Sequence, residues 1–148
     1  MTRAAELTQL VAMQWLKKQR CGGTAAEAQS DSQIKAAHAE DLDARKQATE
    51  SALEGVFAAR TFCPDRMLIA AGHLAEAEHD FDAAKQELYQ AKEHEMASRK
   101  AWQEAGFRHD ILTGQARKAL REEARRADDA AQAERMSLRA ATQKGPRR

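Results

Sequence analysis

Histidines and acids in the middle of the chain are the first residues whose types and spacing could support chemistry. Glu76 and His79 form a Glu-x-x-His step, the spacing that di-iron helical bundles use twice to hold metal. The step occurs once here, and the other nearby histidines have no arrangement of acids that would complete a site. We therefore interpret Glu76 and His79 as surface charges, and we expect neither a metal nor a cofactor.

Other catalytic groupings are not apparent in the sequence. It contains no Gly-rich loop that would cradle a phosphate, and its Ser, His and Asp residues form no nucleophilic grouping. Cys21 and Cys63 have neither metal-ligand spacing nor a disulfide framework, which fits a reducing, cytoplasmic setting. We expect the protein not to be an enzyme.

The composition is typical of long helices rather than of a compact mixed domain. Of 148 residues, 32% are charged and only 5% are aromatic, with two prolines. Such Ala-, Glu- and Arg-rich chains form coiled coils. The net charge of +1 argues against a dedicated nucleic-acid binder. No apolar run is long enough to span a bilayer, so we expect no direct membrane insertion.

Any functional side chains must therefore be positioned by helices, and a heptad pattern predicts how these pack. About seven heptads in one phase are a strong coiled-coil signal. One seam position holds Met67, Leu74, Phe81, Leu88, Glu95, Trp102, His109 and Ala116, and the other holds Ala70, Ala77, Ala84, Ala91, Ser98, Ala105, Leu112 and Ala119. The alanines permit close approach of two antiparallel helices. We expect the polar seam residues Glu95, Ser98 and His109 to weaken this packing, and the phase to shift after Ala119 to Leu120, Ala127 and Leu138.

A turn near residues 61–65 separates two arms. Pro64 suits the first turn of a helix and disfavours helical geometry in the residue before it. The second arm covers about 64–142, followed by a disordered tail at 143–148. The first arm covers about 4–60, and residues 21–23 leave two alternatives open. Either the helix breaks there and restarts at a capping box from Thr24 to Glu27, or it is continuous.

The first arm offers a weaker matching stripe. Leu42, Thr49 and Val56 occupy one position, and Arg45, Ala52 and Ala59 occupy the other. With a tight turn between the arms, the two stripes can pack on each other. The sequence thus predicts an all-α fold in which residues 1–148 form a single domain, an antiparallel coiled-coil hairpin of two long helices.

Two regions are candidates for partner binding. Apolar residues crowd around the turn, and a two-helix tip covers only part of them, so we expect an exposed apolar surface. Basic residues interleave with acids between residues 117 and 129. They are interpreted either as a solvated helix face or as a docking stripe for an acidic partner surface.

A chain of this length, with two long antiparallel helices and a Pro-containing turn before its middle, resembles the FliJ/YscO family, the stalk proteins of flagellar and virulence type III secretion systems. The resemblance rests on Ser98 to Trp102 (SRKAW), on residues 115–129 (QARKALREEARRADD) and on Gln132 to Arg135 (QAER). It covers nearly the whole chain, but in overall pattern, because the family has no sharp motif. The pair Gly22-Gly23 departs from it.

The resemblance implies a non-catalytic central stalk, cytoplasmic and peripheral to the inner-membrane secretion apparatus. Its open end would bind the hexameric export ATPase and its turn would bind the export-gate membrane protein. Some virulence members also bind chaperones of secreted proteins. Mapped by region, the turn side comprises Phe57, Phe62, Met67 and Leu68, and the ATPase side comprises Leu7, Val11, Trp15, Arg121, Arg125 and Arg126.

Another reading is a coiled-coil adaptor or tethering protein that dimerises through the alanine seam. The adaptor predicts a dimer of extended helices, whereas the stalk predicts a monomeric hairpin. A metal-dependent helical enzyme, as a third class, predicts bound iron or manganese.

Overall fold

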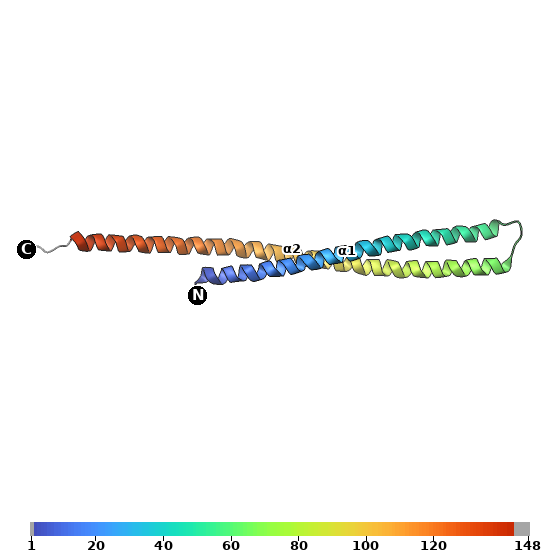
Figure 1. Ribbon diagram of the computed structural model, residues 1–148, viewed down its shortest axis with the longest axis horizontal. Helices are drawn as coiled ribbons and strands as arrows, with labels where there is room; N and C mark the ends of the chain where they lie inside the picture. The colour runs from blue at the N-terminus through green and yellow to red at the C-terminus, as the bar shows by residue number, and fades with distance from the viewer. Residues whose placement is uncertain (1, 144–148) are drawn as a thin grey trace, which may run out of the picture. The chain divides into compact units, whose positions relative to one another are not determined.

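The computed structural model describes residues 2–143 and consists of two helices (Figure 1). Helix α1 covers Arg3–Ala58 and helix α2 covers Pro64–Gln143, and residues 59–63 connect them. The predicted all-α antiparallel hairpin is confirmed. The expected disordered tail lies outside the described residues except for Gln143, which ends α2.

Both helix starts are explained by local hydrogen bonds. The Thr2 hydroxyl accepts from the backbone N–H of Ala5 at 3.3 Å, as an N-cap residue does. At the start of α2, Pro64 occupies the first helical position, where its missing N–H is not needed. The Cys63 carbonyl accepts from the Met67 N–H at 3.2 Å and closes the first turn.

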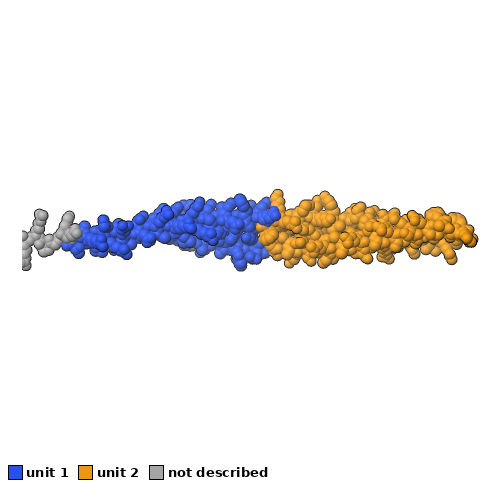
Figure 2. Space-filling model, turned by 90° about the horizontal axis from the view of Figure 1, so that it is seen from above, with its two compact units in different colours: residues 1–20, 103–148 blue, residues 21–102 orange. Residues whose placement is uncertain are grey.

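The described residues group into two compact units, coloured in Figure 2. Unit 2 covers Cys21–Trp102 and includes the connection between the helices. Unit 1 combines the start of α1, up to Arg20, with α2 from Gln103 onward.

Contacts within unit 2 show that α1 and α2 are antiparallel. Ser32 donates to Glu95, Lys35 pairs with Glu87 at 2.9 Å, and the Lys46 ammonium lies 5.5 Å from the centre of the Phe81 ring. The residue number thus rises along α1 as it falls along α2. A small core of Ala39, Leu42 and Ala84 forms between the helices, with Phe81 and Leu88 packed against it.

The predicted seam of α2 is the buried side of the helix. Its alanines at 77, 84, 91, 105, 116 and 119 are buried, and so is Ser98. The larger side chains Met67, Leu74, Phe81 and Leu88 are half-buried. Alanine therefore lies where the backbones approach most closely, and the larger residues flank it.

Two heptad positions were predicted to form the stripe of α1, and the structure confirms the first and contradicts the second. Leu42 is buried and Thr49 and Val56 are half-buried, but Arg45, Ala52 and Ala59 are exposed. The partners of the stripe lie one residue later, at Lys46 and Leu53, which are half-buried. A helical seam alternates steps of three and four residues, and the prediction placed a three-residue step where the helix has four.

With that correction, the seam of α1 runs without interruption from Ala4 to Val56. Its buried or half-buried positions are 4, 7, 11, 14, 18, 21, 25, 28, 32, 35, 39, 42, 46, 49, 53 and 56. Helix α1 accordingly continues through residues 21–23, and the predicted restart between Thr24 and Glu27 does not occur. Of the two alternatives, the continuous helix is the one observed.

Gly22 has a packing role in this continuous helix. A Cβ atom built on Gly22 would lie 3.2 Å from the indole nitrogen of Trp102, whereas one built on Gly23 would meet nothing within 4 Å. The absent side chain at Gly22 thus makes room for the Trp102 ring against α1. A large residue in one helix faces the smallest residue in the other.

The expected phase shift after Ala119 was wrong. Leu120 and Leu138 are exposed, and the original phase continues to Glu123, which is half-buried. The Glu123 carboxylate accepts a hydrogen bond from the backbone N–H of Ala4 at 3.1 Å. In the described part of the chain, residues 124–142 of α2 are all exposed.

Candidate interaction surfaces

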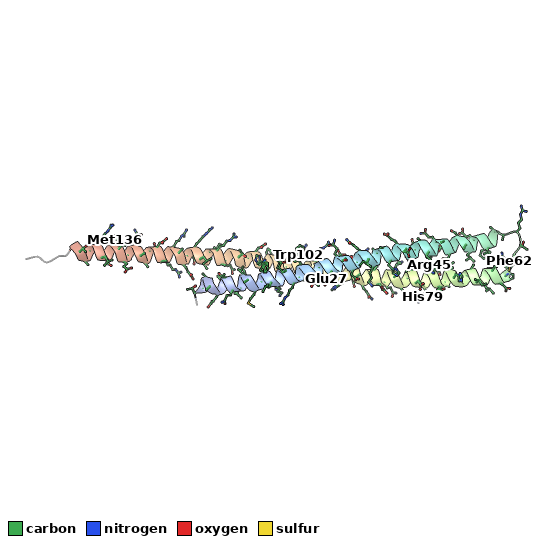
Figure 3. All side chains as sticks on the ribbon, viewed as in Figure 1. Glu27, Arg45, Phe62, His79, Trp102 and Met136 are labelled. Carbon is green, nitrogen blue, oxygen red and sulfur yellow. The ribbon has the colours of Figure 1, made fainter. Side chains whose placement is uncertain are left out.

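The first candidate surface is the apolar tip, which we define as Phe57, Phe62, Leu68 and Ile69. These side chains lie at the end of α1, in the connection and at the start of α2 (Figure 3 labels Phe62). Each is between 61% and 66% exposed. Met67, which was predicted with them, is half-buried in the seam. Three of the four predicted turn-side residues are therefore accessible, and Met67 supports the packing beneath them.

A shallow groove of about 270 Å³ lies beside the apolar tip. Its walls come from both helices and are mainly apolar, with two basic side chains among them: Thr49, Ala52, Val56, Arg66, Ile69, Ala70 and His73. Sequence reasoning placed Val56 and Ile69 near the turn, but it did not identify the groove. The apolar tip and this groove together suit an apolar side chain of a partner that also carries an acidic group.

A second, polar groove of about 210 Å³ continues along unit 2. It is lined by Arg45, Thr49, His73, Glu76, Ala77 and Asp80. Both signs of charge are present, so the groove favours no single ion. Within residues 2–143, no three His, Cys, Asp or Glu side chains are arranged to hold a metal ion.

Two of the three polar residues expected to weaken the α2 seam, Glu95 and His109, have polar partners. The Glu95 carboxylate accepts from the Ser32 hydroxyl across the helices and pairs with Arg99 at 2.8 Å on its own helix. Ser98 is buried, and no buried side-chain polar atom among the described residues lacks a partner. The hydrogen bond between Ser32 and Glu95 therefore adds a specific contact between the helices, because an unpaired buried polar atom would carry a desolvation cost.

Charged contacts between the helices lie at the edge of the seam. The hydrogen bond from Lys35 holds the pKa of Glu87 below 4.5, and the same contact raises the pKa of Lys35 above 10.5. Glu87 is exposed and Lys35 is half-buried at the edge of the seam, so solvent screens the pair and the stabilisation is small. The ammonium groups of Lys46 and Lys85 approach the Phe81 ring at 5.5 and 5.4 Å, which covers an aromatic side chain that alanine neighbours alone would leave open.

The second candidate surface lies in unit 1, on the ATPase side of the prediction. Leu7 and Val11 are half-buried in the seam of α1, whereas Trp15 is exposed. Arg121, Arg125 and Arg126 are exposed on α2. Leu10, which was also expected on this side, is exposed, and sequence reasoning missed two further exposed apolar side chains of α1, Met13 and Leu16. Their exposure follows from the seam positions, because they lie between the residues that face α2.

Comparisons with known proteins add no relative to this picture. No family model, curated protein or solved structure matches the chain. Among the described residues, neither helix contains a stretch apolar and long enough to cross a membrane.

Proposed function

We propose that this chain is a non-catalytic stalk component of a bacterial type III secretion apparatus, which binds a hexameric export ATPase and an export-gate membrane protein. The observation that carries the proposal is the apolar tip, an exposed apolar cluster at the closed end of an antiparallel hairpin. Exposed apolar clusters on proteins commonly mark binding sites. In this proposal the protein is cytoplasmic and peripheral to the inner-membrane apparatus, and chaperones of secreted proteins are further partners.

Stimulation of an export ATPase would arise from binding rather than from chemistry. A ligand that binds only the assembled ring stabilises that ring by mass action. Unit 1 supplies Trp15, Arg121, Arg125 and Arg126 as accessible contacts for such a ring. The direct test is a pull-down of the full chain with a hexameric export ATPase, combined with measurement of ATP hydrolysis. Binding with stimulated hydrolysis is expected, and no binding at micromolar concentration would contradict the proposal.

The gate contact is tested separately at the apolar tip. The double variant Phe62→Asp with Leu68→Asp introduces two charges at exposed positions, so helicity by circular dichroism should not change. Contact with the gate protein should be lost. Tyr89→Asp with Met96→Asp is the matched control, because both residues are equally exposed in unit 2 but lie away from the tip. If the tip variant still binds the gate protein, the apolar tip is not the binding surface and serves only to form the turn.

The adaptor alternative makes an opposite prediction about mass. In the hairpin the seam alanines are already buried against the chain's own helices, which supports a monomer. Light scattering coupled to gel filtration measures the mass directly. A stable dimer would favour the adaptor and remove the main support for the stalk.

A further inference from the structure

Opposite charges separate between the two units although the net charge is only +1. Residues 1–20 and 103–148 contain fifteen Lys and Arg against eight Asp and Glu, whereas residues 21–102 contain nine against fifteen. Unit 1 is therefore basic by seven charges and unit 2 is acidic by six. A partner of unit 1 should carry negative charge.

Within unit 1, basic and apolar residues line up on one face of α2. We call this face the outer stripe: Phe107, Ile111, Gly114, Lys118, Arg121 and Arg125. Steps of three and four residues separate its members, so they form one continuous line on the helix. All are exposed, with Phe107 at 69%. The line is about 27 Å long at the helical rise.

The acids of this segment lie off the outer stripe. Glu123 faces α1 and accepts from the Ala4 N–H, and Asp110 lies beside the His109 ring at 3.2 Å. Glu122 is not a member of the stripe, but it lies four residues after Lys118 and therefore borders the stripe on the helix surface. The outer stripe therefore contains no acid between Phe107 and Arg125, and the next positions on the same line, Glu104 and Asp128, are acids that bound it.

The outer stripe points away from the partner helix. The seam residues of this part of α2, which are buried or half-buried, occupy the opposite side of the helix: Ala105, His109, Leu112, Ala116, Ala119 and Glu123, with half-buried Gly106 and Thr113 beside them. Pairing of α1 and α2 therefore leaves the outer stripe uncovered, and a partner can reach it while the hairpin stays closed.

We propose that the outer stripe binds an anionic lipid surface, which goes beyond the stalk function. Phe107 and Ile111 embed at the boundary of headgroups and acyl chains, and Lys118, Arg121 and Arg125 contact lipid phosphates. A helix face that combines apolar side chains with Lys and Arg adsorbs in this way without crossing the bilayer. The contact would include residues that also face the proposed ATPase, so lipid and ATPase would compete for unit 1.

A lipid surface suits the outer stripe better than the other anionic partners. The stripe follows the outward side of a helix, which a flat surface meets along its whole length. The side chains of Phe107 and Ile111 carry no polar atom, so their transfer from water to an apolar environment is favourable. The phosphate backbone of a nucleic acid offers Ile111 no such environment.

The test uses the full chain and vesicles of phosphatidylcholine with or without phosphatidylglycerol. Sedimentation should show binding to the anionic vesicles only, weakening as salt is raised. The triple variant Lys118→Glu, Arg121→Glu, Arg125→Glu should reduce partitioning by at least about tenfold. Phe107→Ser with Ile111→Ser should also reduce it. Circular dichroism should show unchanged helicity, because every substituted residue is exposed.

The control triple, Arg108→Glu, Arg117→Glu and Arg126→Glu, changes the net charge of unit 1 by the same amount from exposed positions off the stripe. It should retain most of the binding. An equal loss of vesicle binding in both triple variants would show that binding depends on the overall charge of unit 1 and not on the outer stripe. No binding to anionic vesicles would overturn the proposal that the ligand is a lipid surface. Tighter binding to an acidic protein or to nucleic acid would overturn it as well. ATPase pull-down with the Phe107/Ile111 variant keeps the two proposals distinguishable, because loss of lipid binding alone leaves the stalk intact.

Discussion

Gly22 and Gly23 show how neighbouring residues in one helix can have different reasons to be glycine. At Gly22 a side chain would press on the Trp102 ring at 3.2 Å, whereas Gly23 faces open space. Glycine inside a helix costs up to about 1 kcal/mol relative to alanine. That cost is offset at Gly22 by packing and is not offset at Gly23.

Substitution by alanine should therefore separate the two glycines. Gly23→Ala should raise the free energy of unfolding by about 0.5–1 kcal/mol, because it adds helix propensity without a contact. Gly22→Ala should gain less, because the Trp102 ring has to move by a few tenths of an ångström. Urea unfolding followed by circular dichroism measures both. A larger gain at Gly22 would mean that the indole does not pack on α1.

The Lys35–Glu87 pair gives a pH-dependent prediction at the same scale. The lowered pKa of the Glu87 carboxyl stabilises the fold above the carboxyl's unfolded pKa, and this stabilisation is lost as pH falls through the folded pKa. The raised pKa of Lys35 stabilises the fold below the lysine's unfolded pKa, and that stabilisation is lost as pH rises through the folded pKa. Wild type should thus exceed Glu87→Gln in stability from about pH 5 to pH 10. The difference should vanish in acid and in strong base. Thermal melts across pH check this, with exposed Glu78→Gln as control; a difference that persists at pH 2 would refute it.

At the scale of elements, the alanine seam determines how closely α1 and α2 approach. Ala84 is buried with Ala39 and Leu42, whereas its neighbour Ala83 is exposed. A larger side chain at a seam alanine has to push the helices apart, because the space is filled. The same side chain one residue earlier enters solvent.

Leucine at these two positions should have different effects. Ala84→Leu should lower the free energy of unfolding by about 1–3 kcal/mol through overpacking. Ala83→Leu should change it by no more than about 0.5 kcal/mol. Chemical denaturation of the pair supplies the comparison. Equal effects would show that α1 does not lie against this side of α2.

The part of α2 beyond Glu123 contributes helix but no packing. Residues 124–142 are exposed, including Met136 (Figure 3). A chain that ends at Ala130 should lose ellipticity from the missing helical residues, while its unfolding midpoint stays within error of wild type. Hydrogen exchange should also be fast after Arg126 and slow around Ala84. A clearly lower midpoint would reveal contacts made by the deleted residues.

The two helices differ in how far their packing could be predicted from sequence. The α2 seam alternates large apolar residues with alanine, so its phase is visible. Positions in the α1 seam include buried Ser32 and the half-buried lysines Lys18, Lys35 and Lys46. A lysine can lay its apolar stem along the partner helix while its charge stays in water. Exposed Ile34 and Leu10 add apolar residues outside the seam. The local pattern therefore pointed to a register that was wrong by one residue.

The candidate surfaces were predictable to different degrees for a related reason. Crowding of large apolar residues around a short connection signals exposure at any register, so the apolar tip was found. Charges were first considered along the sequence, where Arg121 and Arg125 alternate with Glu122 and Glu123. Only their angular positions around α2 separate the bases from the acids, and these depend on knowing which side is buried.

For the whole molecule, the net charge of +1 conceals two units of opposite sign. A ligand responds to the unit it approaches rather than to the sum, because screening limits charge interactions to about 10 Å at moderate salt. Electrostatic behaviour near neutral pH should thus combine that of a basic protein with that of an acidic one.

Ion exchange offers a direct check. At low salt and pH 7 the full chain should bind both a cation and an anion exchanger. Reversal of Lys118, Arg121 and Arg125 to glutamate should weaken retention on the cation exchanger and strengthen it on the anion exchanger. Elution from both resins in the void volume would mean that the two sets of charges compensate locally.

The unbroken alternation of three- and four-residue steps from Ala4 to Val56 limits how this chain can change in length. One inserted residue turns every later side chain by about 100°, so a single insertion near Ile34 would carry Leu42 into solvent. An insertion of seven residues restores the phase of α1, but α2 then needs an insertion of seven residues at the facing position to keep the two seams paired. Insertions and deletions should therefore be tolerated in matched blocks of seven, or singly in residues 59–63 and after Glu123.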